Sequence, residues 1–163
     1  MQPYEGATPE QLSHPLVGHF LAVHDMFRSQ LQSILNYVED LIAGDAVLSD
    51  PQTKARTHAL IRAGAQYTHY LHFHHNAETT VMFPALEKEG LDVAVVERLN
   101  ADHDEISVLI DKFNEAIQNL ATIEPEVLNN DMRRLADALH AHLAYEETHV
   151  CPLMTRWTEF PTH

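Results

Sequence analysis

The chain has 163 residues, enough for one domain with a sizeable core, and it carries 24 acidic against 10 basic residues. The formal net charge of −14 repels phosphate backbones and anionic lipid surfaces, which argues against nucleic acid and membranes as partners. No run of about 18 apolar residues is present, so no membrane-spanning helix is expected.

The cysteine content and the first residues bear on the compartment. The single cysteine, Cys151, allows no internal disulfide, and the start MQPYEGATPEQ has neither the basic flank nor the apolar run of a signal peptide. Both features predict a protein of the reducing cytoplasm. Only five glycines occur, and Leu, Ala, Glu and Gln are plentiful, which favours an all-helical chain.

Four segments carry apolar residues at alternating spacings of three and four, the pattern of a helix packed in a bundle. These core-facing positions run from Phe20 to Leu41, from Leu60 to Ala85, from Val96 to Leu120 and from Leu128 to Leu153. The first helix is expected to end near Gly44-Asp45. The second is expected to begin at Ser49 or Asp50 and to end at Gly90.

The short connections between these segments predict the architecture. We expect an all-α protein whose helices form an antiparallel up-down-up-down four-helix bundle. The whole chain, residues 1–163, is predicted to be a single domain, with the bundle at about 15–154, a short N-terminal arm and a C-terminal tail. The tail, with Trp157 and Phe160, is expected to cover one end of the bundle.

Polar residues interrupt the apolar faces, and two of the interruptions have the same form. The stretch His74-x3-Glu78-x5-Pro84 is repeated later in the chain as His142-x3-Glu146-x5-Pro152. Residues four apart lie on one face of a helix, so each histidine and glutamate can reach the same point. The complete set of polar residues at core-facing positions is His24, His74, Glu78, His103, His142, Glu146 and His149.

In an antiparallel bundle these groups meet at one level, where burying them without partners costs several kcal/mol each. Imidazole and carboxylate together suit transition-metal ions. Four histidines and two carboxylates are too many for one tetrahedral ion, so two ions are expected, each with two imidazoles, two bridging oxygens, a solvent bridge and one open position. The predicted ligands are His24, His74, Glu78, His103, His142 and Glu146. The alternative is a metal-free network of His–Glu hydrogen bonds.

Three further residues stand close to this set. His149 is expected to support or pack against the site, and His75 to be a surface or boundary histidine, although it lies three residues before Glu78. Glu147 is expected to point away from the core. The sequence does not decide whether any of the three binds a metal.

The same elements resemble the hemerythrin family, specifically the bacterial HHE cation-binding domains. The matching stretches are VHDMF, HFHHNAETTVMFP, ADHDEI and HLAYEETHVCPL, and the resemblance covers about residues 16 to 154. It implies a four-helix bundle around two oxo- or hydroxo-bridged iron ions, with the same six residues as ligands. The pattern does not distinguish iron from zinc or manganese at either position.

The chain departs from the oxygen-carrying members of that family. They have a second histidine where this chain has Ser107, and an aspartate where Glu147 stands. The missing histidine predicts a second open position, which favours reaction with peroxide or NO over reversible O2 carriage. We expect a di-iron protein that binds or reacts with O2, H2O2 or NO, with catalase-like peroxide breakdown as its enzymatic form. The alternative is an iron-buffering or metal-responsive interaction protein. The catalytic residues and the oligomeric state stay open.

Overall fold

The computed structural model describes residues 3–43 and 51–162, and within these ranges it contains helices and no strand. The all-α prediction is therefore confirmed. The long helices are α2 (Pro15–Ala43), α3 (Pro51–Ala77), α5 (Val93–Gln118) and α6 (Pro125–Met154). The short elements are α1 (Pro9–Ser13), the π-helical segment η1 (Glu78–Met82) and α4 (Phe83–Lys88). The helix boundaries expected at Gly44-Asp45 and at Ser49 or Asp50 lie outside the described residues.

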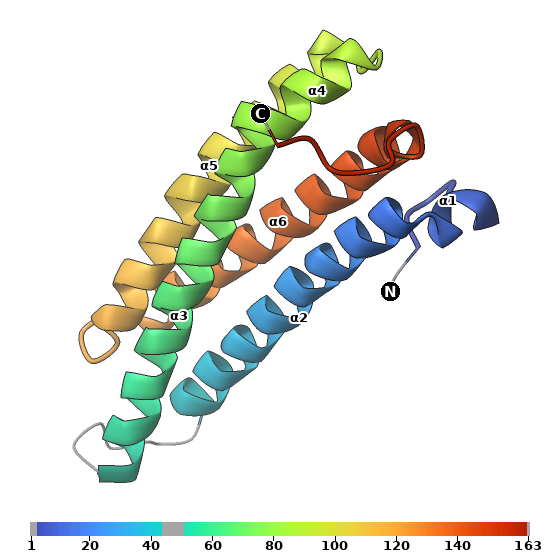
Figure 1. Ribbon diagram of the computed structural model, residues 1–163. Helices are drawn as coiled ribbons and strands as arrows, with labels where there is room; N and C mark the ends of the chain where they lie inside the picture. Colours follow the sequence, from blue (N-terminus) through green and yellow to red (C-terminus); the bar gives the residue numbers. More distant parts are fainter. Residues whose placement is uncertain (1–2, 44–50, 163) are drawn as a thin grey trace.

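Each long helix packs against two of the other three. Helix α2 contacts α3 and α6, and α5 contacts the same two helices from the other side. Figure 1 shows that successive long helices run in opposite directions, and that α3, η1 and α4 follow one another as a single rod. This rod ends before Gly90, whose φ of 103° is readily adopted only by glycine, so the predicted stop at Gly90 is confirmed.

The π-helical segment changes which residues of the rod face the core. The backbone N–H of Phe83 donates to the carbonyl of Glu78, five residues earlier instead of four, which widens the turn by one residue. Val81 and Ala85, which we expected to face the core, are only partly buried. The buried residues of this stretch are Met82, Phe83 and Leu86.

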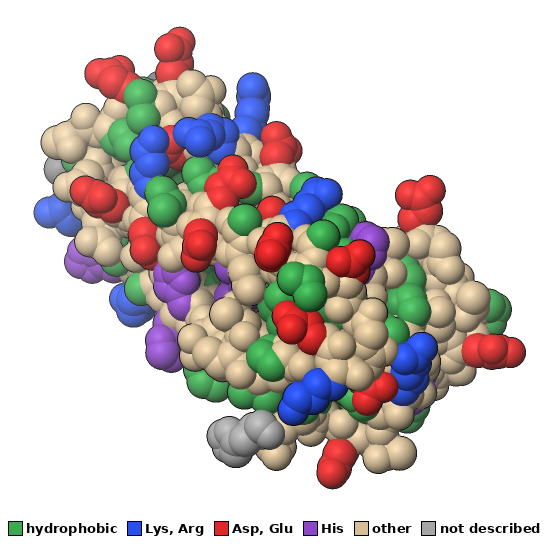
Figure 2. Space-filling view, turned by 90° about the horizontal axis from the view of Figure 1, so that it is seen from above, with side chains coloured by type: hydrophobic (Ala, Val, Ile, Leu, Met, Phe, Trp, Pro, Cys, Tyr) green, Lys and Arg blue, Asp and Glu red, His purple; other side chains and the backbone are tan. Residues whose placement is uncertain are grey.

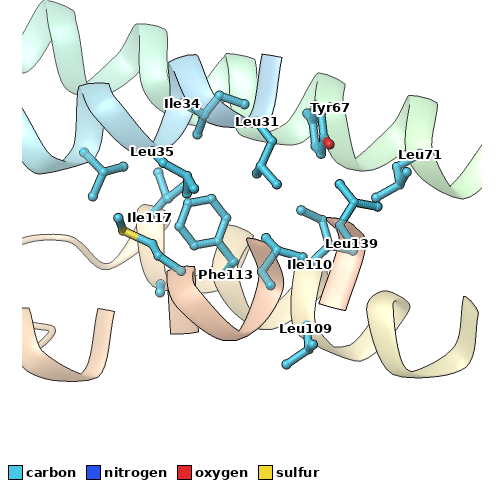
Figure 3. Close-up of a cluster of buried hydrophobic side chains, with 14 of the residues drawn as sticks. Leu31, Ile34, Leu35, Tyr67, Leu71, Leu109, Ile110, Phe113, Ile117 and Leu139 are labelled. Atoms are coloured by element: carbon cyan, nitrogen blue, oxygen red, sulfur yellow. The ribbon is translucent and has the colours of Figure 1, made fainter. Parts of the chain in front are cut away.

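The apolar core consists of two clusters at different levels of the helices. The larger cluster lies toward the α2–α3 connection and includes Leu35, Phe113 and Ile117, which lie together in Figure 3. The smaller cluster lies toward α1 and the C-terminal tail and includes Leu21, Phe83 and Leu99, with Trp157 and Phe160 packed against it. Between the two clusters lies a polar layer.

Acidic residues outnumber basic residues in the chain by 24 to 10. Figure 2 shows acidic side chains spread over the visible face of the molecule instead of gathered in one patch. In the part of the chain that the structure describes, no helix combines the length and the apolar character needed to cross a membrane.

The larger cluster contains one buried hydroxyl, and it generates a first prediction. Tyr67 is 2% exposed, and its hydroxyl donates to the carbonyl of Phe27 at 2.9 Å, which joins α3 to α2. Tyr67→Phe should lower the free energy of unfolding by about 1 kcal/mol, because a buried hydrogen bond is lost. Denaturant unfolding measures this change. Tyr70→Phe is the matched control, since Tyr70 is 46% exposed, and it should have almost no effect. Equal effects of both variants would contradict the role of this bond.

Candidate metal centre

The polar layer brings together side chains from all four long helices and from η1. It lies about one helical turn from the closest members of each apolar cluster, for example between Leu21 and Phe27 along α2. All six residues predicted from the sequence lie in this layer, together with one that was not predicted. The seven residues are His24, His74, His75, Glu78, His103, His142 and Glu146.

The atoms that these residues turn toward one another have no hydrogen-bond partner. They are the Nε2 atoms of the five histidines and both carboxylate oxygens of Glu78 and Glu146. Leaving one such buried group without a partner costs about 1–3 kcal/mol, and more when it is charged. A protein domain is stable by only about 5–15 kcal/mol in total, so a set of this size requires a compensating partner. Bound cations fit this requirement.

The two glutamates are oriented as bridges between two pairs of histidines. Glu146 Oε1 lies 3.2 Å from His24 Nε2, and its Oε2 lies 3.4 Å from His142 Nε2. Likewise, Glu78 Oε2 lies 3.4 Å from His74 Nε2, and its Oε1 lies 3.3 Å from His103 Nε2. Two ligand atoms about 2.1 Å from one ion and at right angles to each other are about 3 Å apart. These separations therefore suit neighbouring ligands of a shared ion.

The donor atoms fall into two groups, each with all its atoms within 4.8 Å of one another. One group is His24, His74, Glu78 and Glu146, and the other is His75, Glu78, His103 and His142. Glu78 belongs to both, and Glu146 reaches the second group through its contact with His142. The arrangement offers two imidazoles to one ion and three to the other. Nitrogen and carboxylate donors in these numbers suit iron, zinc or manganese.

His75 is buried, so the expectation that it is a surface or boundary histidine was wrong. Its ring stacks on that of His103, with 3.9 Å between centroids and an interplanar angle of 10°. The adjacent His74 faces the other way, toward His24, at a centroid distance of 5.5 Å. Because α3 packs between α2 and α5, two successive residues of the helix each meet a different neighbour. The sequence signal for His75 was its spacing of three residues from Glu78.

Glu147 was also misplaced by the sequence analysis, because it is buried and faces α2. Its carboxylate lies 2.8 Å from His24 Nδ1, and Arg28 donates to both of its oxygens at 2.8 Å. This contact fixes the ring of His24 with Nε2 turned toward the polar layer. A carboxylate that holds the outer nitrogen of a metal-binding histidine also makes its inner nitrogen a better donor.

Two other histidines of the layer are held at their outer nitrogens in the same way. Asp102 Oδ2 lies 3.2 Å from His142 Nδ1, and Thr79 Oγ1 lies 3.0 Å from His103 Nδ1. These contacts come from α5 and η1, so the ring orientations depend on neighbouring helices. His149, by contrast, lies outside the layer and packs against Tyr145 at a centroid distance of 4.4 Å.

Burial sets the charge of the layer before any metal binds. Burial lowers the pKa of His74 to about 4 and that of His103 to about 3, with further lowering by neighbouring histidines. The pKa of His75 is lowered for the same reasons. Burial and the charge of Glu146 raise the pKa of Glu78 well above its usual range. Neutral imidazoles are the form that binds metals, so these histidines are ready to do so at neutral pH.

A cavity of ≈ 370 Å³ opens beside the layer. His74 and Glu78 line it together with residues of α2, of η1 and of the C-terminal tail, including Phe160. The tail, which we expected to cover one end of the bundle, thus forms part of the wall of this cavity. The cavity lies on the side of the group with two imidazoles.

The shifted pKa values predict how the metal-free protein responds to acid. From about pH 6.5 to about pH 4.5 the unfolded chain binds protons at His74, His75 and His103 that the folded chain does not bind. The free energy of unfolding should therefore fall on acidification, by roughly 1.4 kcal/mol per pH unit for each additional proton on the unfolded chain. Urea unfolding with a chelator present, at several pH values, measures this slope.

Two groups of the polar layer have raised pKa values and affect this slope differently. Glu78 opposes the three histidines, since its folded form holds a proton that the unfolded chain releases above about pH 4.5. Burial alone lowers the pKa of His24, but the contacts of this ring with Glu146 and Glu147 raise the pKa overall. The contribution of His24 to the free energy of unfolding is therefore constant below about pH 6.5. Because three histidines outweigh one glutamate, the free energy of unfolding still falls on acidification. Rising stability over this window would contradict the assigned burial.

His75→Ala tests the histidine that the sequence analysis missed. The variant should hold the metal of its group more weakly and so retain less iron per chain than the unmodified protein, because three imidazoles are reduced to two in that group. Metal analysis after reconstitution and desalting measures this, and the melting temperature should fall with the iron content. His69→Ala is the control, since His69 is an exposed histidine of the same helix. Full iron content in His75→Ala would remove this residue from the ligand set.

Comparison with known proteins agrees with this geometry. The family model of the hemerythrin HHE cation binding domain matches residues 16–154, a range that holds all seven residues of the layer. No curated protein and no solved structure gave a significant match. The resemblance drawn from the sequence motifs is confirmed. Because this family model matches most of its length, the chain belongs to the hemerythrin family, whose domain is described as cation-binding.

Proposed function

We propose that the long helices form an antiparallel up-down-up-down bundle that holds two iron ions, and that this centre binds or reacts with O2, peroxide or NO. The observation that supports this best is the pair of donor groups that share Glu78 beside a cavity reaching His74 and Glu78. When bound, iron supplies Lewis acidity and one-electron redox chemistry toward such molecules. As a free thiol, Cys151 is compatible with a cytoplasmic location, which we also propose.

The residues of the polar layer would have different roles in holding such a centre. The five imidazoles supply neutral nitrogen donors, and the two glutamates supply the negative charge that offsets the cations. The outer contacts of His24, His103 and His142 keep three of the rings in position without reorganisation. The apolar clusters on either side exclude bulk water, which strengthens the electrostatic interactions inside.

The histidine count changes the expectation for open coordination positions. Ser107 predicted a second open position because this helix lacks a second histidine. His75 reaches the same donor group as His103 from α3, so five imidazoles are available after all. We therefore infer that the open position lies at the ion held by His24 and His74. One open position supports the binding of one small ligand per centre. Binding of O2 therefore stays in the proposal, together with reaction with peroxide or NO.

Iron buffering is the second candidate, and the unpartnered atoms of the layer favour it. A fold that must satisfy five imidazoles and two carboxylates gains much of its stability when ions bind. Such a protein would respond to the supply of iron by folding and unfolding. The cavity beside His74 is the observation that favours the reactive centre, since a store needs no cavity for a second ligand.

The two functions are separated by adding ligands to the reduced, iron-loaded protein. We expect about two iron ions per chain and an oxidisable centre whose visible spectrum changes on separate addition of O2, H2O2 and NO. Stopped-flow absorption after anaerobic reduction measures each reaction, and a zinc-loaded sample controls for chemistry of the protein alone.

Each result selects among the functions. A stable O2 band that disappears under vacuum would mean reversible carriage, and rapid loss of peroxide would mean enzymatic breakdown. If iron binds but the centre reacts with none of the three molecules, iron buffering would be the remaining function. Failure to bind iron at all would overturn the proposed function.

A further inference from the structure

The cavity beside the polar layer is mostly apolar. Its wall is formed by α2, η1 and the C-terminal tail, and the apolar lining includes Phe20, Val23, Val81, Met82, Phe160 and Pro161. Two of its other lining residues, His19 and Thr162, are exposed and form an outer polar rim. The ring of Phe160 lies 5.7 Å from that of His19, so the tail closes one side of the cavity against α2.

The inner end of the cavity reaches the candidate centre. His74 and Glu78 both line it. The side chain of His74 is 18% exposed, whereas the other residues of the layer are at most 7% exposed. The centre is therefore most accessible at His74, on the side with two imidazoles. A molecule held in the cavity would meet the centre there.

The cavity is larger than the smallest candidate ligands require. Its volume of ≈ 370 Å³ lies within the range of about 300–1,000 Å³ that is common for pockets of organic ligands. One water molecule occupies about 30 Å³ in the liquid, and O2, NO and H2O2 have two heavy atoms each. These molecules would leave most of the cavity unfilled. The volume fits a ligand with an organic tail.

Polarity and charge restrict the ligand further. H2O2 would give up hydrogen bonds to water in an apolar cavity, which costs free energy, whereas an alkyl or aryl tail gains from leaving water. Among the described lining residues there is no Lys or Arg to pair with an anion. The net charge of −14 also repels anions from the protein. A neutral head group is therefore favoured.

We propose that this cavity binds the tail of a neutral organic hydroperoxide, ROOH, with the O–O group placed at His74 and Glu78. This rests on the proposed function, and it names the class of peroxide that the centre takes. Reduction would break the O–O bond and give the alcohol ROH and water. Two electrons would come from the two ferrous ions, which become ferric, and two protons would come from solvent. The balance is ROOH + 2e⁻ + 2H⁺ → ROH + H2O.

Binding can be measured without turnover. The probe is 2-phenylpropan-2-ol, the alcohol formed from cumene hydroperoxide, titrated calorimetrically into the oxidised iron-loaded protein. We expect saturable binding at one site that Val81→Phe weakens by about tenfold or more, because the larger side chain fills the cavity. Val108→Phe is the matched control, since Val108 is 66% exposed on α5 and lies outside the cavity.

A second pair of variants guards against a folding defect in Val81→Phe. Phe160→Ala removes an apolar wall from the tail and leaves the helices untouched, and it should also weaken the binding of the alcohol. Its control is Phe73→Ala, because Phe73 is 70% exposed and does not line the cavity. No saturable binding to the unmodified protein, or equal binding by Phe160→Ala, would overturn the assignment of the cavity.

Kinetics then test the choice between peroxides. The reduced centre should be oxidised by cumene hydroperoxide about tenfold or more faster than by H2O2, and Val81→Phe should lower this ratio of rate constants. A ratio near one, unchanged in the variant, would overturn the inference while leaving the proposed function standing. A centre that reacts with neither peroxide but does bind the alcohol would refute the proposed peroxide chemistry and retain the binding site.

Discussion

The structure depends on burying a polar layer between two apolar clusters. Five imidazole nitrogens and four carboxylate oxygens lie there without hydrogen-bond partners, so the helices gain little by coming together at this level unless cations bind. The clusters on either side hold the helices at a fixed spacing and keep water away from the layer. The same burial that makes the layer costly lowers the pKa values of His74, His75 and His103 and keeps these three imidazoles neutral. Stability and metal affinity are therefore linked through the same atoms.

Much of this arrangement could be predicted from the sequence, because apolar spacing marks the core-facing side of a helix and polar interruptions of it are costly. That reasoning found six of the seven residues that the structure brings together, and it found them through position alone. It treated each core-facing side as one column of residues, however. Each long helix packs against two neighbours, so two adjacent columns are buried. His75 lies in the second column of α3 and Glu147 in that of α6, which is why both were misplaced.

The π-helical segment could not be predicted from spacing. It begins at Glu78, and it moves the buried residues of the rod from Val81 and Ala85 to Met82 and Phe83. Periodicity arguments assume 3.6 residues per turn, and one widened turn is enough to break the register. Insertions of this kind recur at functional sites, and here the wide turn also forms part of the cavity wall, through Val81 and Met82.

The two halves of the layer differ in a way that bears on chemistry. On the side of His75, His103 and His142, the rings of His75 and His103 stack, and Asp102 and Thr79 contact the outer nitrogens of His142 and His103. On the other side, His24 is held by Glu147 and Arg28, while His74 faces a cavity. Placing the fifth imidazole on α3 at His75, instead of at Ser107 on α5, completes the first side without obstructing the second. The asymmetry follows from the packing of α3 between α2 and α5, since His75 turns to α5 and His74 to α2. A ligand that approaches through the cavity thus meets the centre at His74, its most exposed residue.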